Sequence, residues 1–300
     1  MTVTCRRFLT CLLLVAILCS GSQLSSPQTQ PGKPWLDHWR LSTFSFGSVD
    51  RDQNGRQFFR VIGTGFFAGL DEKNGYIVTA KHVFREDAID WHPTELRMRF
   101  GWQEHKSVYD EFGTTLKLRD ERGTDLWKAP DDGSDVAAIV PDFEVRDVPV
   151  DAMFVTDFAG KDDVFEGASV IVIGYPGVIG NEYLVRSIIR AGIIAWTDPD
   201  SPLDKSLMID VNVMPGNSGS PVLKIPIGLS REGAAFGGNR VVLLGLVSRG
   251  PLQQSDLELR VPGTAEPIHI KTQISGVGGI GVVVPASKIT ELLNHMSRRQ

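Results

Sequence analysis

Three short segments carry polar side chains that could together perform nucleophilic catalysis. His82 follows the β-rich run YIVTA, Asp135 opens the run DVAAIV, and Ser218 lies in the turn PGNSGSP. A serine hydroxyl attacks a carbonyl efficiently only when an imidazole removes its proton and a carboxylate orients that imidazole. Each residue alone has an ordinary structural explanation: a histidine packed beside a strand, an acid opening a strand, a serine in a glycine-rich loop. Together they predict a catalytic triad.

Short strands separated by turns must position these residues. Runs such as QFFRVIGTGFFAG and ASVIVIGYP are rich in β-branched and aromatic residues, and the pairs Asn54-Gly55 and Asn74-Gly75 are typical of hairpin turns. Helical spacing is clear only in ASKITELLNHMSRR, where Ser287 could cap the first turn. The sequence therefore predicts an all-β protein with a C-terminal helix over 286–296.

A change of composition at Pro141–Asp151 divides the strands into two similar groups. We expect one β-barrel over about 35–145 and a second over about 150–285. The polar, proline-containing residues 23–34 contain nothing to bury and are typical of a flexible tether.

The three motifs TAKHVF, SDVAAIV and GNSGSPV resemble the motif blocks of the chymotrypsin-like (trypsin-like) serine peptidases. GLVSRG at 245–250 is similar to the family's substrate-binding strand, and GIGVVVPASKI at 279–289 resembles the end of the bacterial HtrA-type protease domain. This resemblance implies a peptidase domain over 35–296, built of two six-stranded antiparallel β-barrels and a C-terminal helix, without a PDZ module.

The resemblance also implies a role for each site residue. Ser218 would be the nucleophile, His82 the general base and then acid, and Asp135 the carboxylate that orients the imidazole. The backbone N–H groups of Gly216 and Ser218 would form the oxyanion hole. The residues expected to contact substrate are Asn212, Ser248, Arg249, Gly250 and Gly281.

Several positions depart from well-known members of the family. Asn212 occupies the pocket position where relatives that cut after Lys or Arg carry an acid, so we expect a small or medium uncharged side chain there instead. Arg249 replaces an apolar or aromatic residue and would favour acidic residues at the cleft entrance. Asn217 replaces the aspartate that pairs with a new amino terminus, so activation should not depend on trimming the chain.

The expected activity is that of a serine endopeptidase acting on protein or peptide substrates, without metal or cofactor. The alternative is a catalytically silent, peptidase-like domain that binds unfolded or partner proteins; the three filled triad positions favour the enzyme. Three weaker patterns favour no other chemistry. A dinucleotide-binding pattern at 276–281 lacks the helix that should follow it, and the acids at 198–204 do not have the spacing of an EF-hand calcium site. His92 and His105 lack a third zinc ligand.

Composition indicates the class of protein, and the first residues indicate where it is located. The chain is 42% hydrophobic and 22% charged, which is typical of a globular protein, and its net charge of −5 argues against nucleic-acid binding. Two arginines, an apolar run from Phe8 to Leu18 and small residues after it predict a signal peptide over 1–22, and hence a periplasmic or secreted protein. An uncleaved membrane anchor and lipid attachment at Cys19 are the alternatives. All three cysteines lie in this leader, so the exported chain would contain no disulfide.

Overall fold

Strands make up most of the computed structural model, in which residues 36–300 form one compact unit. The residues that it describes are 35–71, 75–105, 108–143, 151–177, 186–229, 235–237, 240–250, 252–259, 268–275 and 279–298. The predicted signal peptide and tether lie outside these residues. None of the described helices is both long and apolar enough to cross a membrane.

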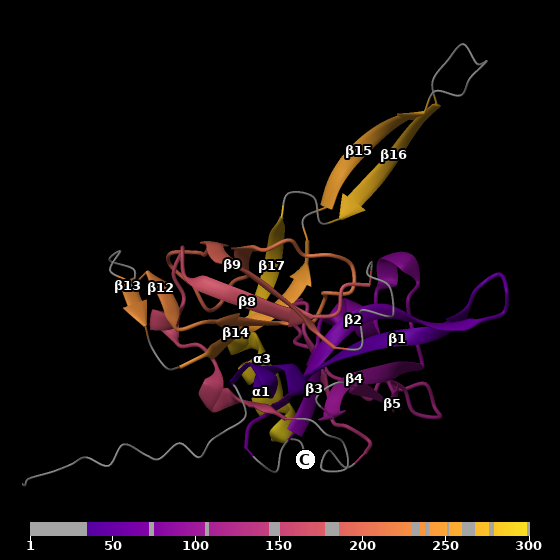
Figure 1. Cartoon of the computed structure of the whole chain (residues 1–300), viewed down its shortest axis with the longest axis horizontal. Helices are drawn as coiled ribbons and strands as arrows, with labels where there is room; N and C mark the ends of the chain where they lie inside the picture. Colours follow the sequence, from indigo (N-terminus) through magenta and orange to yellow (C-terminus); the bar gives the residue numbers. More distant parts are fainter. Residues whose placement is uncertain are drawn as a thin grey trace, which may run out of the picture. The chain divides into compact units, whose positions relative to one another are not determined.

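The first group of strands forms a curved, open sheet (Figure 1). Its order is β5-β4-β1-β2-β3-β6, and β7 pairs with β2. The bounds are β1 Thr43–Arg51, β2 Gln57–Gly69, β3 Gly75–Thr79, β4 Glu95–His105, β5 Val108–Lys117, β6 Ala137–Ile139 and β7 Met153–Phe154. The turn at Asn54-Gly55 joins β1 to β2 as predicted, with Gly55 at a φ of 78°. The predicted first barrel is thus a half-barrel sheet.

The second group of strands closes into a barrel in the order β10-β17-β14-β11-β8-β9. The bounds are β8 Ser169–Gly174, β9 Ile188–Trp196, β10 Leu207–Asp210, β11 Pro221–Lys224, β14 Val242–Arg249 and β17 Ile280–Pro285. Buried valines, leucines and isoleucines from alternate strand positions fill its interior, as a small closed barrel requires. The chymotrypsin-like double-barrel prediction is confirmed, with one barrel closed and the other half open.

Two further hairpins interrupt the second barrel. β12 (Ile227–Leu229) pairs with β13 (Ala235–Gly237), and β15 (Leu252–Leu259) pairs with β16 (Ile268–Ser275) (Figure 1). The sequence does not show whether these two hairpins, or the segments 228–239 and 251–275 around them, affect access to the cleft.

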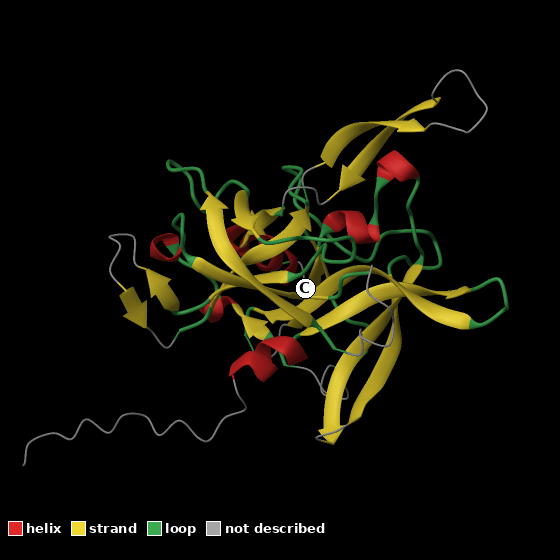
Figure 2. Cartoon of the chain, turned by 45° about the horizontal axis from the view of Figure 1, so that its top comes forward, coloured by secondary structure: helices red, strands yellow, loops and turns green. Residues whose placement is uncertain are grey.

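Three helices complete the fold, shown in red with the shorter 3-10 turns in Figure 2. α1 (Trp35–Leu41) was not predicted, α2 (Lys81–Phe84) is a single turn, and α3 (Ala286–Ser297) is the predicted C-terminal helix. The prediction that Ser287 caps α3 is wrong: Pro285 is the N-cap residue, and the Ser287 hydroxyl donates a hydrogen bond to the Leu203 carbonyl.

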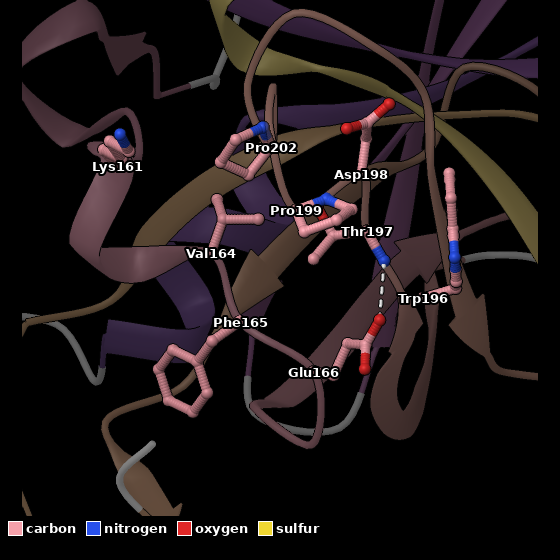
Figure 3. A pocket seen from close by; sticks show the side chains of 9 residues that line it. All are labelled: Lys161, Val164, Phe165, Glu166, Trp196, Thr197, Asp198, Pro199 and Pro202. Carbon is pink, nitrogen blue, oxygen red and sulfur yellow. Dashed lines mark hydrogen bonds between the residues drawn. The ribbon is translucent and has the colours of Figure 1, made fainter. Parts of the chain in front are cut away.

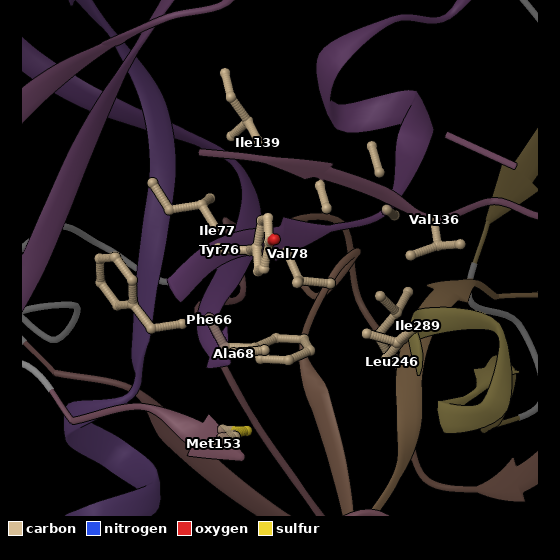
Figure 4. Packing of buried hydrophobic residues seen from close by; sticks show 14 of the residues in the cluster. Phe66, Ala68, Tyr76, Ile77, Val78, Val136, Ile139, Met153, Leu246 and Ile289 are labelled. Atoms are coloured by element: carbon tan, nitrogen blue, oxygen red, sulfur yellow. The ribbon is translucent and has the colours of Figure 1, made fainter. Parts of the chain in front are cut away.

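One apolar cluster joins the sheet, the barrel and α3. Buried side chains of the sheet, such as Phe66 and Tyr76, belong to the same cluster as Leu246 of β14 and Ile289 of α3 (Figure 4). Burial of this apolar surface is the main force that holds the two groups of strands together. The loops that carry His82, Asp135 and Ser218 are therefore fixed to one shared core.

Candidate active site

His82 lies in the single helical turn α2, which begins two residues after β3 ends at Thr79. The next two residues, Val83 and Phe84, are each only 1% exposed and anchor the turn in the core. Val83 packs on Gly63 of β2 so closely that a Cβ at residue 63 would lie 2.6 Å from a valine methyl carbon. The buried residues that follow His82 thus fix the turn from which its ring extends.

Asp135 binds His82 with both carboxylate oxygens. The His82 Nδ1 atom lies 2.8 Å from Oδ2 of Asp135, and the His82 backbone N–H donates to Oδ1 at 3.0 Å. An ionised carboxylate can only accept hydrogen bonds, so Nδ1 carries the proton and Nε2 keeps its lone pair. The geometry therefore prepares Nε2 to accept a proton.

Ser248 contributes a third hydrogen bond to this carboxylate, because its hydroxyl donates to Oδ2 of Asp135 at 2.5 Å. Burial alone would raise the pKa of Asp135, but the hydrogen bonds from His82 and Ser248 outweigh burial and lower it to about 2. Asp135 is therefore ionised at neutral pH. The sequence predicted Ser248 only as a substrate contact, whereas its side chain holds the acid in place.

Ser218 is half-buried and lies in the loop before β11. Its carbonyl accepts a hydrogen bond from the Thr64 N–H at 2.7 Å and would lie 3.3 Å from a Cβ on Gly63, the residue against which Val83 packs. The loops of Ser218 and His82 thus meet on the same part of β2. Among the described residues the Ser218 hydroxyl makes no hydrogen bond, so the structure links His82 to Asp135 directly but not to Ser218.

Two glycines allow the Ser218 loop its tight path. Gly216 and Gly219 have φ values of 93° and 85°, in the region that favours glycine. A Cβ at Gly219 would lie 2.0 Å from the Thr64 carbonyl oxygen, and one at Gly216 would lie 2.5 Å from the Tyr175 carbonyl oxygen. The loop can therefore lie this close to β2 and β8 only with glycine at both positions.

The backbone of the nucleophile loop determines which N–H groups are left without a protein acceptor. The Pro215 carbonyl accepts from the Gly177 N–H at 2.8 Å, and the N–H of the same trans peptide, on Gly216, points the opposite way. Within the described part of the chain, the N–H groups of Gly216 and Ser218 donate to no protein acceptor. Both are available to a substrate oxygen.

Asn217 holds the loop from within. Its side-chain Oδ1 accepts from the Met214 N–H at 3.1 Å, while its own N–H donates to the Met214 carbonyl at 3.0 Å. The side chain is buried, and these two bonds close a tight turn ahead of the nucleophile. This geometry agrees with the expectation that the loop is set by its own hydrogen bonds.

Thr64 is a residue that the motif search missed. It is fully buried, and its hydroxyl donates to the Gly216 carbonyl at 2.8 Å and accepts from the Tyr175 N–H at 3.0 Å. Its backbone N–H binds the Ser218 carbonyl, so Thr64 contacts the loop on both sides of Asn217. The only signal in the sequence is a threonine between two glycines in a β-rich run, which does not point to this role.

A cleft of about 390 Å³ opens beside His82 and Asp135, and Ser218 is not among the residues that line it. Arg249, exposed at the end of β14, lines it together with His82 and Asp135. The full lining is Lys81, His82, Arg85, Glu86, Asp87, Gly133, Asp135 and Arg249. The position of Arg249 fits the expected cleft entrance, and its preference for acidic residues stays a prediction.

The other expected substrate contacts gather at one end of the second barrel. Gly281 of β17 lies opposite Ile209 of β10, and a Cβ on it would lie 2.5 Å from Val213. Asn212 is exposed just beyond β10, and Gly250 is buried just beyond β14, which pairs with β17. The structure thus brings these residues to neighbouring strands, as the resemblance implied.

The alternative chemistries gain no support. A second cavity, of about 550 Å³, is lined in part by Glu166, Thr197 and Asp198 (Figure 3). Asp198 forms an ion pair with Lys205 at 2.7 Å and accepts two backbone N–H bonds within its own loop. Across the described residues, no three His, Cys, Asp or Glu side chains are placed to share a metal ion. The 276–281 pattern lies partly outside the described residues.

A family model of the trypsin-like peptidase domain matches residues 63–228, more than half of the chain and including all three triad positions. The chain belongs to the trypsin-like peptidase domain family. A search among curated proteins gave no match. Membership in this family accounts for the two groups of strands and for the three loops that meet between them.

Proposed function

We propose that this trypsin-like peptidase is an exported serine endopeptidase that cleaves polypeptide substrates through an acyl-enzyme on Ser218. The observation that carries the proposal is the doubly hydrogen-bonded His82–Asp135 pair, at 2.8 and 3.0 Å, beside a loop with two unpaired N–H groups. Within the family, the segment GIGVVVPASKI at 279–289 favours the HtrA-type group.

Acylation follows from the geometry of these groups. Nε2 of His82 removes the Ser218 proton as Oγ attacks the carbonyl carbon, and the resulting imidazolium is stabilised by the ionised Asp135. The N–H groups of Gly216 and Ser218 bind the oxyanion. His82 then donates its proton to the leaving amine, and the peptide C–N bond breaks.

Deacylation repeats these steps with water. His82 removes a proton from the water molecule that attacks the acyl-enzyme, and then returns it to Ser218 Oγ as the ester bond breaks. Every proton in the cycle is carried by His82, and each charge that develops faces a group described above. The proposed reaction therefore needs only groups that this chain supplies.

Labelling with a fluorophosphonate tests the proposal, because the probe bonds only to an activated serine. We expect the wild-type protein to be labelled, and Ser218→Ala and His82→Ala to lose labelling and about 10⁴–10⁶-fold in kcat on casein. Ser220→Ala is the matched control, since Ser220 is buried two residues away and its hydroxyl has no partner among the described residues. This control should be labelled normally.

Two outcomes would count against the enzyme. A folded wild-type protein that is neither labelled nor active on casein would support the silent, protein-binding alternative. Folded Ser218→Ala protein that cleaved casein at the wild-type rate would show that another group is the nucleophile. Export is tested separately, by sequencing the amino terminus of protein recovered outside the cytoplasm, which should begin near Gln23.

A further inference from the structure

Arg190 occupies an inward-facing position in the second barrel. In the antiparallel pair β8–β9 it lies directly opposite Val172, which is 1% exposed and belongs to the barrel core. Directly opposed residues share a face of the sheet, and so do alternate residues along one strand. Ile194, four residues further along β9, is fully buried in the same core. Arg190 thus lies on the inner face, near the end where β9 begins.

The guanidinium group reaches the chain segment that leads to the nucleophile. One nitrogen donates to the Asn212 carbonyl, and Nη2 lies 3.1 Å from Sδ of Met214. Asn212 is the residue that the family resemblance places in the specificity pocket. Met214 in turn is bonded to Asn217 of the nucleophile loop. The positive charge therefore lies where the side chain of a bound substrate would be read.

Among the described residues, this cation has no anionic partner. None of the described carboxylates forms an ion pair with Arg190, and Asp210, at the end of β10, is exposed. Partial burial lowers the pKa of Arg190, and no neighbouring acid opposes that effect. An arginine that is partly buried on the inner face of a barrel without a counter-ion contributes little to folding alone, because its charge is desolvated without an opposite charge to compensate it.

A residue without a side chain, Gly281, lies on a strand that pairs with β10, just before Asn212. Gly281 faces the same interior, since it pairs with the buried Ile209, and any side chain on it would collide with Val213. Mouths of β-barrels are frequent ligand sites, and a guanidinium can hold a carboxylate through two parallel hydrogen bonds.

We propose that Arg190 determines specificity and binds an acidic side chain, Glu or Asp, of the residue before the scissile bond. This inference rests on the proposed function. It replaces the uncharged side chain expected from Asn212 alone and keeps the exclusion of Lys and Arg, which Arg190 would repel.

Two peptides that differ only in Glu or Gln before the scissile bond isolate the charge, because the two side chains have nearly the same shape. We expect wild-type kcat/KM to be about 10- to 100-fold higher for the Glu peptide, the usual range for a hydrogen bond to a charged group. In Arg190→Gln this ratio should fall to about 1, mainly through loss of activity on the Glu peptide.

Controls separate specificity from catalysis and folding. Arg56→Gln removes one positive charge from an exposed turn and should leave the ratio unchanged. Fluorophosphonate labelling needs no acidic side chain in the substrate, so Arg190→Gln should still be labelled. A folded wild-type protein that is not labelled would refute the proposed function rather than this inference. If Arg190→Gln does not fold, the wild-type ratio alone still decides.

A wild-type enzyme that cleaves the Gln peptide as fast as the Glu peptide would overturn the inference. So would an Arg190→Gln variant that keeps the wild-type ratio. Equal losses on both peptides would assign Arg190 a purely structural role in bracing residues 212–214, which also contradicts the proposal.

Discussion

Replacing Thr64 by valine tests whether the hydroxyl that bridges the two groups of strands sets the oxyanion loop. Valine keeps the shape of threonine but removes its donor and acceptor. The Gly216 carbonyl would lose the donor that now lies 2.8 Å away, and the Tyr175 N–H would lose its acceptor at 3.0 Å. Because Thr64 is fully buried, water cannot readily replace the hydroxyl.

The size of the effect follows from these two bonds. A buried group left without its partner costs about 1–3 kcal/mol, so with two such groups the free energy of unfolding should fall by about 2–6 kcal/mol. If the loop shifts at Gly216 because its carbonyl has lost this donor, the Gly216 N–H moves away from the oxyanion, and kcat should fall by about 10²–10³-fold. KM should change little, since the oxyanion forms only as the reaction proceeds.

Steady-state kinetics on one peptide, together with urea unfolding, would measure both effects. Thr64→Ser keeps the hydroxyl and should recover most of the lost kcat, whereas a role based on methyl packing would leave it as impaired as Thr64→Val. A folded Thr64→Val enzyme with kcat within about 2-fold of the wild type would refute the reasoning, because the loop would then hold its shape without this bond.

Two further predictions concern acid stability and activation. The pKa of Asp135 is lowered to about 2 in the folded protein, below the ordinary value of 3.8. The stabilisation that the ionised carboxylate gives the folded state is therefore complete above about pH 5 and is lost as the pH falls towards 2. Between pH 5 and pH 2 the free energy of unfolding, measured with urea, should fall by about 2 kcal/mol less in Asp135→Asn than in the wild type. The same pH dependence in both proteins would contradict the hydrogen-bonding account. Because the buried side chain of Asn217 is neutral and bonded to Met214, proteins that begin at Gln23, with or without a short extension before it, should have equal kcat/KM. A latent extended form, activated only by trimming, would show that the loop depends on a new amino terminus.

The sequence was sufficient for the features that depend on local pattern. Asn54-Gly55 marked a hairpin because few residues adopt positive φ, and the helical stripe of residues 286–296 marked α3. His82, Asp135 and Ser218 could be proposed because catalysis demands particular residue types beside particular turns, and the structure shows the bond between His82 and Asp135. What local pattern could not show was closure: whether β5 meets β6 depends on the curvature of the whole sheet, and the structure leaves that edge open.

The residues that sequence reasoning missed were missed because their roles depend on partners far away in the chain. Thr64 and Ser248 are common strand residues, and their roles come from partners 152 and 113 positions away in the chain. No window of sequence contains such a pair. Only the packing of the half-barrel against the closed barrel brings the Thr64 hydroxyl to Gly216 and the Ser248 hydroxyl to Asp135.

Arg190 shows how a conflict between pattern and position can indicate function. In the strand IIRAGIIAW a charged residue would ordinarily be assigned to the outer face, because burying a charge is unfavourable. The register with β8 places it on the inner face instead, opposite Val172. A residue that violates its local preference needs compensation, and at a binding site the ligand supplies it. The acid that would compensate Arg190 is absent from the described chain, and so we look for it in the substrate.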